Sequence, residues 1–141
     1  MPTLNDPRDL RRRVAAAPVA RLATLRSDGR PRLVPVTFAL VDELLCFAVD
    51  DVKPKRDMRL ARLADIARDD RVALLVDHYD TDWSALWWVR IDGQAVEHAT
   101  GALRERAVDA LAAKYAPYRA RRPAGPVVAI TPLQWAGWSA S

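Results

Sequence analysis

Apolar residues along this chain recur mostly at the short spacing of β-strands. Residues 19–25 alternate between apolar and polar. Residues 71–77 predict a strand whose continuous apolar run, residues 72–76, suits burial on both faces. Residues 32–40, 44–49 and 127–133 are further candidate strands, and residues 86–97 predict one long strand. The pattern therefore predicts about six strands, several of them joined by tight turns.

Three segments instead show helical spacing. In residues 6–17, Asp6 can cap a helix that places Leu10, Val14 and Ala17 on one stripe. A second helix starts near Lys53, and a third runs over residues 101–114 behind a Thr100 cap. The second helix would turn Leu60, Leu63, Ala64 and Ala67 inward, and the third would turn Leu103, Ala107, Ala110 and Leu111 inward.

Prolines and glycines punctuate the predicted strands. Gly29 lies in a hairpin turn over residues 27–30, and Gly93 indicates a bulge in the long strand. Pro35 cannot donate a hydrogen bond, so the strand around it has an unpaired edge that leaves backbone groups available to a ligand. Residues 115–126 hold three prolines and predict a loop.

Strands joined by turns, with helices between them that do not alternate strictly, favour a mainly antiparallel small barrel with peripheral helices. The chain has 141 residues, and no linker or repeat divides residues 1–141, so we expect a single domain. Trp87 and Trp88 are adjacent in a strand and must point to opposite faces, so one can enter the core while the other lines a cleft.

The distribution of charge adds one feature to the predicted barrel, a basic cluster at residues 53–56. The net charge is +4, almost all of the cations are arginines, and two of the three lysines lie at residues 53–55. Arginines scattered over several elements without an aromatic platform argue against a nucleic-acid partner. The single cysteine, Cys46, permits no internal disulfide, and the sequence shows neither a signal peptide nor a membrane span, so we expect a cytoplasmic protein.

The most specific chemistry lies where the strand ending at Val49 leads into the second helix. Lys53, Lys55 and Arg56 surround Pro54 at the helix start, where free N–H groups and the helix dipole already favour an anion. This arrangement predicts a phosphate site, and a solvated basic helix start is the alternative. The sequence has no dinucleotide fingerprint or P-loop, and neither histidine has metal-ligand spacing, so we predict no metal site.

A phosphate cradle, an edge strand and five tryptophans together fit a flat, phosphate-bearing aromatic cofactor. Such a cofactor would carry the redox chemistry itself, which explains why no catalytic constellation is visible. Tyr79, Asp80 and Asp82 could act as acids or bases, but a polar loop also explains them.

At this point the chain resembles a known family. Residues 19–25, the segment 31–38, the Lys53 to Arg56 cluster, residues 71–83, residues 86–90 and the ending at residues 135–138 are similar to the pyridoxamine 5′-phosphate oxidase-like split barrels. The similarity is greater to their deazaflavin-dependent branch in actinobacteria. It implies a six-stranded antiparallel split β-barrel that forms a homodimer, with two cofactor sites at the subunit interface.

The resemblance also implies roles for individual residues. The cofactor ring would face the strand at Pro35 to Thr37, the basic cluster would contact the phosphate, and aromatic residues would close the site. The predicted cofactor-binding set is therefore Val34, Pro35, Val36, Thr37, Val49, Lys53, Lys55, Arg56, Trp83, Trp87, Trp88 and Trp138. The substrate residues of true pyridoxamine phosphate oxidases are not identifiable here.

We therefore expect a reductase that uses the deazaflavin coenzyme F-420 to pass a hydride to an unsaturated or quinone-like small molecule. No catalytic residue is assigned, and the proton could come from solvent, Tyr79 or an aspartate. An FMN-dependent oxidoreductase is the alternative on the same fold, and a non-catalytic flavin or deazaflavin carrier is another. Some split barrels bind haem, but neither histidine lies in a recognisable ligand setting.

Overall fold

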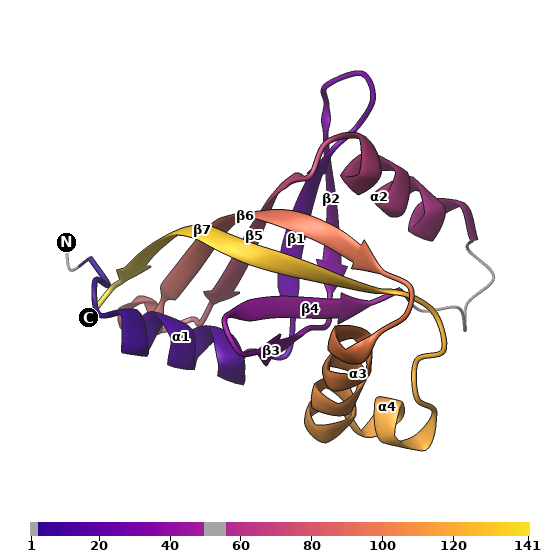
Figure 1. The fold of residues 1–141 in the computed structure, drawn as a ribbon. Helices are drawn as coiled ribbons and strands as arrows, with labels where there is room; N and C mark the ends of the chain where they lie inside the picture. Colours follow the sequence, from indigo (N-terminus) through magenta and orange to yellow (C-terminus); the bar gives the residue numbers. More distant parts are fainter. Residues whose placement is uncertain (1–2, 50–55) are drawn as a thin grey trace.

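A computed structural model describes residues 3–49 and 56–141, with side chains from residue 61 onward in the second helix. Antiparallel strands and flanking helices make up the chain (Figure 1). In chain order the elements are α1 (Pro7–Ala16), β1 (Ala20–Leu25), β2 (Pro31–Val36), β3 (Ala39–Val41), β4 (Leu44–Ala48), α2 (Arg56–Arg68), β5 (Arg71–His78), the 3-10 turn η1 (Trp83–Ala85), β6 (Trp87–His98), α3 (Ala102–Lys114), α4 (Ala116–Ala120) and β7 (Val127–Ser139).

The seven strands form one sheet in the order β2-β1-β5-β6-β7-β4-β3, and every pairing is antiparallel. The edge strands β2 and β3 are consecutive in sequence and are separated only by Thr37 and Phe38. A flat sheet would hold its edges about 29 Å apart, whereas the chain from Val36 to Ala39 spans at most about 11 Å. The sheet must therefore roll up, and it has the form of the predicted split barrel. We call residues 37 and 38 the seam.

The seam also corrects the predicted strand count. The segment 32–40 is not one strand, because both backbone groups of Phe38 bond to side chains rather than to a neighbouring strand. The split yields seven strands instead of six. Pro35 lies in the edge strand β2, as its missing N–H predicted.

The inside of the rolled sheet holds the main core. Alternate residues of the strands point inward and pack with Leu10 and Val14 of α1 and with Ile66 of α2. Among the largest fully buried side chains are Phe38, Leu22, Leu45, Leu74, Ile91 and Ile130. The predicted α1 stripe is confirmed, because Leu10, Val14 and Ala17 are all buried and Asp6 caps the helix by accepting from the Arg8 N–H.

The helix α2 presents a different face from the predicted one. Ala64 and Ala67 are exposed and Leu63 is half-buried, while Asp65 and Ile66 are buried. The prediction was wrong for Ala64 and Ala67, because hydrophobic periodicity cannot anticipate a buried carboxylate that is held by ion pairs, whereas Leu63 packs against the core as predicted. Leu60 lies outside the described side chains.

The ends of the later elements also differ from expectation. Gly101, not Thr100, is the N-cap of α3, with φ 107°, and no side chain caps this helix. The short helix α4 occupies part of the predicted loop, with Pro117 in its first turn. The last strand extends to Ser139 rather than Leu133, because β7 pairs with β6 as far as Trp87.

The bulge predicted at Gly93 is confirmed by a register shift between Asp92 and Gly93. A Cβ atom at Gly93 would lie 2.6 Å from the Thr131 carbonyl oxygen, so only glycine fits this close approach.

The outer side of the sheet has two unlike halves. Over β3, β4 and β7, helix α3 buries the outward residues Val41, Cys46, Val127 and Ala129 (Figure 1). Over β2, β1, β5 and β6, the outward residues have no such cover among the described elements, and Leu33 and Leu75 are 69% and 38% exposed. In this single chain β5 is therefore buried on one face, not on both as predicted. We call this second half the open face.

Candidate functional site

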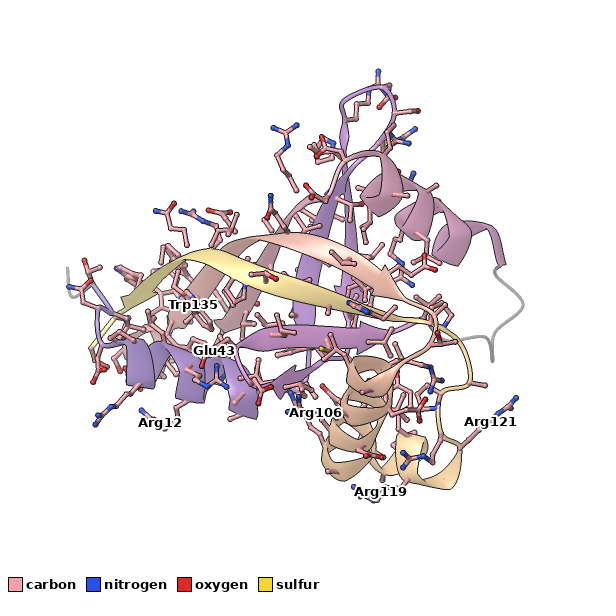
Figure 2. The ribbon with its side chains drawn as sticks, in the orientation of Figure 1. Arg12, Glu43, Arg106, Arg119, Arg121 and Trp135 are labelled. Carbon is pink, nitrogen blue, oxygen red and sulfur yellow. The ribbon has the colours of Figure 1, made fainter. Side chains whose placement is uncertain are left out.

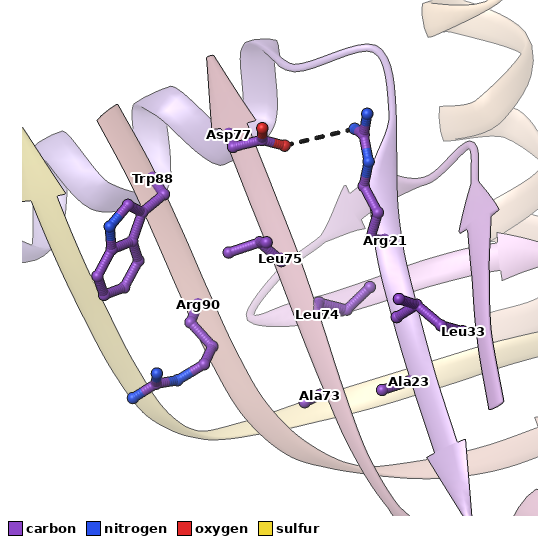
Figure 3. Close-up of a pocket in the computed structure, with 9 residues that line it drawn as sticks. All are labelled: Arg21, Ala23, Leu33, Ala73, Leu74, Leu75, Asp77, Trp88 and Arg90. Carbon is purple, nitrogen blue, oxygen red and sulfur yellow. Dashed lines mark ion pairs between the residues drawn. The ribbon is translucent and has the colours of Figure 1, made fainter. Parts of the chain in front are cut away.

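The open face contains a hollow of about 450 Å³ (Figure 3). Its apolar floor comes from β1, β2 and β5, and the residues that line it are Arg21, Ala23, Leu33, Ala73, Leu74, Leu75, Asp77, Trp88 and Arg90. The Arg21 guanidinium pairs with Asp77 at 3.5 Å, and the Arg90 guanidinium lies 5.7 Å from the centre of the Trp88 ring. The hollow thus combines an apolar surface, one tryptophan and two arginines.

The predicted ring-binding strand borders this hollow. Pro35 is exposed and pairs with Arg21, one of the lining residues, whereas Val36 is 7% exposed and Val34 packs against the core. The four residues predicted to face the ring, Val34 to Thr37, therefore fall into two groups. Those of Val34 and Val36 support the fold, while Pro35 and the half-buried Thr37 are accessible.

The predicted phosphate cradle lies mostly outside the described residues. Lys53 and Lys55 are not described, and Arg56 is described only as the first residue of α2. Val49 is buried, and its N–H donates to the Pro126 carbonyl at 2.9 Å. The predicted strand and helix are both present, since β4 ends at Ala48 and α2 begins at Arg56, while the predicted turn lies outside the described residues.

A buried carboxylate fixes α2 to the strands of the open face. Asp65 accepts from Arg32 at 2.7 Å, from the Thr24 hydroxyl at 2.9 Å and from Arg68 at 3.1 Å. Burial alone would raise the pKa of Asp65, but these three hydrogen bonds outweigh it and leave that pKa below its ordinary value. The carboxylate is therefore charged near neutral pH and holds the helix against β1 and β2.

The four predicted tryptophans lie at one end of β5 and β6 but face different ways. Trp87 packs against the core, and Trp88 lines the hollow, so the opposite-face prediction for this pair is confirmed. Trp138 pairs with Trp88 across β6 and β7, and Trp83 is 69% exposed on η1. Trp135 of β7 packs against the core (Figure 2).

A second cavity, of about 430 Å³, lies beside this end of the sheet. Asp77 lines both cavities. The Arg13 guanidinium lies 5.2 Å from the Trp87 ring centre, and His78 stacks on the same ring at 6.4 Å. Pro18 forms part of the wall that faces the seam.

Sequence reasoning missed the polar groups at the seam, because Tyr115 and Tyr118 lie in the segment predicted as a loop and Lys114 is the last residue of the predicted third helix, where it had no role. Tyr118 and Thr37 share a hydrogen bond at 3.1 Å, and the Lys114 ammonium donates to the Phe38 carbonyl at 2.9 Å. Tyr115 accepts from the Phe38 N–H at 3.1 Å. The one available signal was spacing, since positions 114, 115 and 118 share a face if the helix continues.

Neither a nucleophilic cysteine nor a metal site finds support in the described residues. Burial raises the pKa of the Cys46 thiol to about 11, so it stays protonated and is a poor nucleophile. Within residues 3–49 and 56–141, no group of three or more histidine, cysteine, aspartate or glutamate side chains could hold a metal ion.

A rolled antiparallel sheet with a cavity beside its edge strand defines the split-barrel class. The family model described as pyridoxamine 5′-phosphate oxidase matches residues 7–139, so the chain belongs to this family. No protein with curated annotation matches it.

Solved structures share the fold at low sequence identity. A conserved hypothetical protein of Mycobacterium tuberculosis is 18% identical, with a TM-score of 0.81 over 98% of this chain and 87% of that one. An FAD-binding protein of Mesorhizobium loti is 21% identical, with a TM-score of 0.70 over 96% and 95%. The haem storage protein HutZ of Vibrio cholerae is 11% identical, with a TM-score of 0.70 over the same shares.

In the described part of the chain, no helix has the length and apolar character needed to cross a membrane.

Proposed function

We propose that this protein is an oxidoreductase that uses the deazaflavin coenzyme F-420 to reduce an unsaturated or quinone-like small molecule. The observation that carries the proposal is the family match over residues 7–139, taken with the hollow beside the predicted ring-binding strand. The sequence resemblance to the deazaflavin-dependent branch favours F-420 over other planar cofactors. We place the enzyme in the cytoplasm.

The described residues fit a planar cofactor. The hollow has an apolar floor, with an indole and two arginines at its margin, and flat aromatic ligands with anionic tails prefer such surroundings. In the proposed site Pro35 and Thr37 meet the ring, and Lys53, Lys55 and Arg56 meet the phosphate. Trp88 covers part of the ring, and Trp83 and Trp138 complete the aromatic surroundings, whereas Trp87 packs against the core on the opposite face of β6.

When bound, the reduced coenzyme supplies a hydride. The residues of the chain hold ring and substrate in contact and exclude water, which favours direct transfer. The ion pair between Arg21 and Asp77 fixes one wall of the hollow, and the contacts of Asp65 fix α2 behind the predicted phosphate cradle.

We further propose a homodimer in which the open face meets a second copy. On the open face, Leu33 is 69% exposed and Leu75 is 38% exposed, so apolar surface is left in contact with water. A second copy of the chain would bury this surface. The apolar run over residues 72–76 of β5 is typical of a strand covered on both faces, and in this chain only the inner face is covered. In a dimer, the second copy would cover the outer face of β5, which accounts for its apolar sequence.

Titration with the oxidised and reduced coenzyme tests the cofactor. We expect binding at micromolar concentrations or below, followed by oxidation of the reduced coenzyme when a quinone such as menadione is added. Failure to bind either form at micromolar concentrations would overturn the proposal.

FMN is the second candidate, favoured by the similar fold of a protein described as FAD-binding. A yellow protein after purification, with FMN released on denaturation, would favour it. Coenzyme binding without turnover across a broad panel of acceptors would instead favour a carrier.

A further inference from the structure

The second cavity, beside the end of α1, contains two arginines and a histidine to which no role has yet been given. The residues that line it are Arg12, Arg13, Ala16, Ala17, Pro18, Asp77, His78 and Trp87. Its volume of about 430 Å³ lies within the range of small-molecule sites, roughly 300–1,000 Å³. The second cavity is therefore large enough to hold a ligand of its own.

The second cavity and the hollow of the open face use opposite faces of β6. Trp87 lines the second cavity and packs against the core, whereas Trp88, the next residue, lines the hollow. Adjacent residues of a strand point to opposite faces of the sheet. A ligand that contacts Trp87 would therefore not occupy the hollow proposed for the coenzyme.

The guanidiniums of Arg12 and Arg13 supply positive charge to the second cavity. Both pair with Asp9, Arg12 through Nη2 and Arg13 through Nε at 3.2 Å. Two guanidiniums thus share one carboxylate, and each has five N–H donors, so several donors remain for a ligand. Two N–H groups of one guanidinium match the two oxygens of a carboxylate, which favours an anion of this kind.

The acidic groups of this region are already paired with cations or with a histidine. Among the described residues that line the second cavity, only Asp77 carries a carboxylate, and Arg21 pairs with it at 3.5 Å. Asp80 lies 3.7 Å from Nε2 of His78. An anionic ligand beside Arg12 and Arg13 would therefore meet little opposing charge.

His78 and Trp87 form an aromatic wall of the second cavity. Their rings stack with centres 6.4 Å apart and an interplanar angle of 21°, and the Arg13 guanidinium lies 5.2 Å from the Trp87 ring centre. Pro18 extends the apolar surface. A planar aromatic group is favoured beside such a wall, because offset stacking adds to the burial of apolar area.

The helix dipole explains only part of this arrangement. A cation in the last turn of a helix stabilises the dipole, and Arg13 lies in the last turn of α1. The dipole does not account for the stacked rings of His78 and Trp87 or for the volume beside them. The combination of guanidiniums, aromatic rings and volume instead points to a ligand.

We propose that the second cavity binds an aromatic carboxylate, with its ring beside His78 and Trp87 and its carboxylate on the guanidiniums of Arg12 and Arg13. The inference goes beyond the proposed function, because this ligand is not the coenzyme and lies on the other face of β6.

The first test measures charge selectivity in the protein without coenzyme. Isothermal titration calorimetry compares 1-naphthoate with the neutral 1-naphthylmethanol and the cationic 1-naphthylmethylammonium. We expect 1-naphthoate to bind at least about tenfold more tightly than the alcohol, and the ammonium ion to bind most weakly. Equal affinities for the three probes, or no binding of 1-naphthoate at millimolar concentrations, would overturn the inference.

The second test locates the bound probe with variants. Arg13→Met should raise the dissociation constant of 1-naphthoate about tenfold, and Arg12→Met about threefold because that side chain is 74% exposed. The matched control is Arg8→Met, which removes an exposed cation from the same helix but outside the second cavity, and it should change the constant less than about twofold.

A further variant, Arg90→Met, removes a cation of the hollow. We expect it to leave the affinity for 1-naphthoate within about twofold of wild type. A loss of affinity in Arg90→Met but not in Arg12→Met or Arg13→Met would place the probe in the hollow and contradict the second site.

A spectroscopic test does not depend on whether Arg13→Met folds. The chain has five tryptophans, so the wild type labelled with ¹⁵N-tryptophan gives up to five indole N–H resonances. We expect 1-naphthoate to shift the resonance of Trp87 more than that of Trp88, with both assigned from Trp87→Phe and Trp88→Phe. A larger shift for Trp88 would contradict the proposed location.

This inference and the proposed function fail in different ways. A protein that binds F-420 but not 1-naphthoate contradicts the second site alone. A protein that binds 1-naphthoate in the expected manner but not F-420 contradicts the proposed function alone.

Discussion

One sheet presents two outer surfaces that differ in what covers them. Over β3, β4 and β7, small residues such as Cys46 and Ala129 let α3 pack closely, and they are buried. Over β2, β1, β5 and β6, the outward residues include Ala23 and Ala73 beside large or charged ones, and Leu33 remains 69% exposed. The two halves therefore differ less in residue size than in cover, because α3 lies over one half and the other is left for a ligand or a partner.

The strongest test of this contrast puts a charge on each half. Ala129→Arg forces a guanidinium beneath α3, where Ala129 is 4% exposed. We expect it to lower the free energy of unfolding by about 4 kcal/mol or to prevent folding. Urea denaturation followed by circular dichroism measures the change, and a loss under 1 kcal/mol would mean that α3 does not seal this half.

The matching change on the open face should act on assembly instead. Leu75→Arg puts the same charge on β5, where the native side chain is 38% exposed. We expect the fold to persist and the dimer dissociation constant to rise about a hundredfold. Sedimentation equilibrium across a dilution series measures it. Equal masses for variant and wild type at every concentration would remove the open face as the interface.

A smaller effect is expected at the boundary between the open face and α2. Asp65→Asn leaves Arg32 and Arg68 without their carboxylate, at a cost of about 2 kcal/mol at pH 7. Asp28→Asn, at an exposed turn, is the control and should change little. The change in the free energy of unfolding of each variant is measured from its urea denaturation midpoint.

The loss of stability caused by Asp65→Asn should depend on pH. The pKa of Asp65 is lowered in the folded state, so its stabilisation is present above the unfolded value of 3.8 and is lost as pH falls through the folded value. The difference between wild type and Asp65→Asn should therefore shrink below about pH 4. A difference that stays constant from pH 7 to pH 2 would contradict the ionic role.

The smallest effect is expected at the seam that joins the two halves. Tyr115→Phe removes a hydroxyl that contacts the backbone of Pro18 and Phe38. We expect a loss of about 1 kcal/mol in the free energy of unfolding, with coenzyme affinity unchanged. Thermal unfolding measures the change in stability, and fluorescence titration measures the coenzyme affinity. A large loss of affinity would show that Tyr115 belongs to the site.

Local patterns in the sequence determined much of this protein. Alternation of apolar residues predicted the strands, Asp6 the start of α1, Pro35 an edge strand and Gly93 a bulge, because each depends on neighbours within a few residues. The barrel class followed from the order of these elements. The basic cluster at Lys53 to Arg56 is also a local signal, and its role stays a prediction.

The tertiary structure decided what depends on residues far apart in the chain. Phe38 leaves the sheet because Lys114 and Tyr115, more than 70 positions away, take its backbone hydrogen bonds. Asp65 is buried because Arg32 and Thr24 meet it from strands that precede it. No periodicity encodes such pairings, since they arise only when tertiary folding brings segments far apart in the chain together.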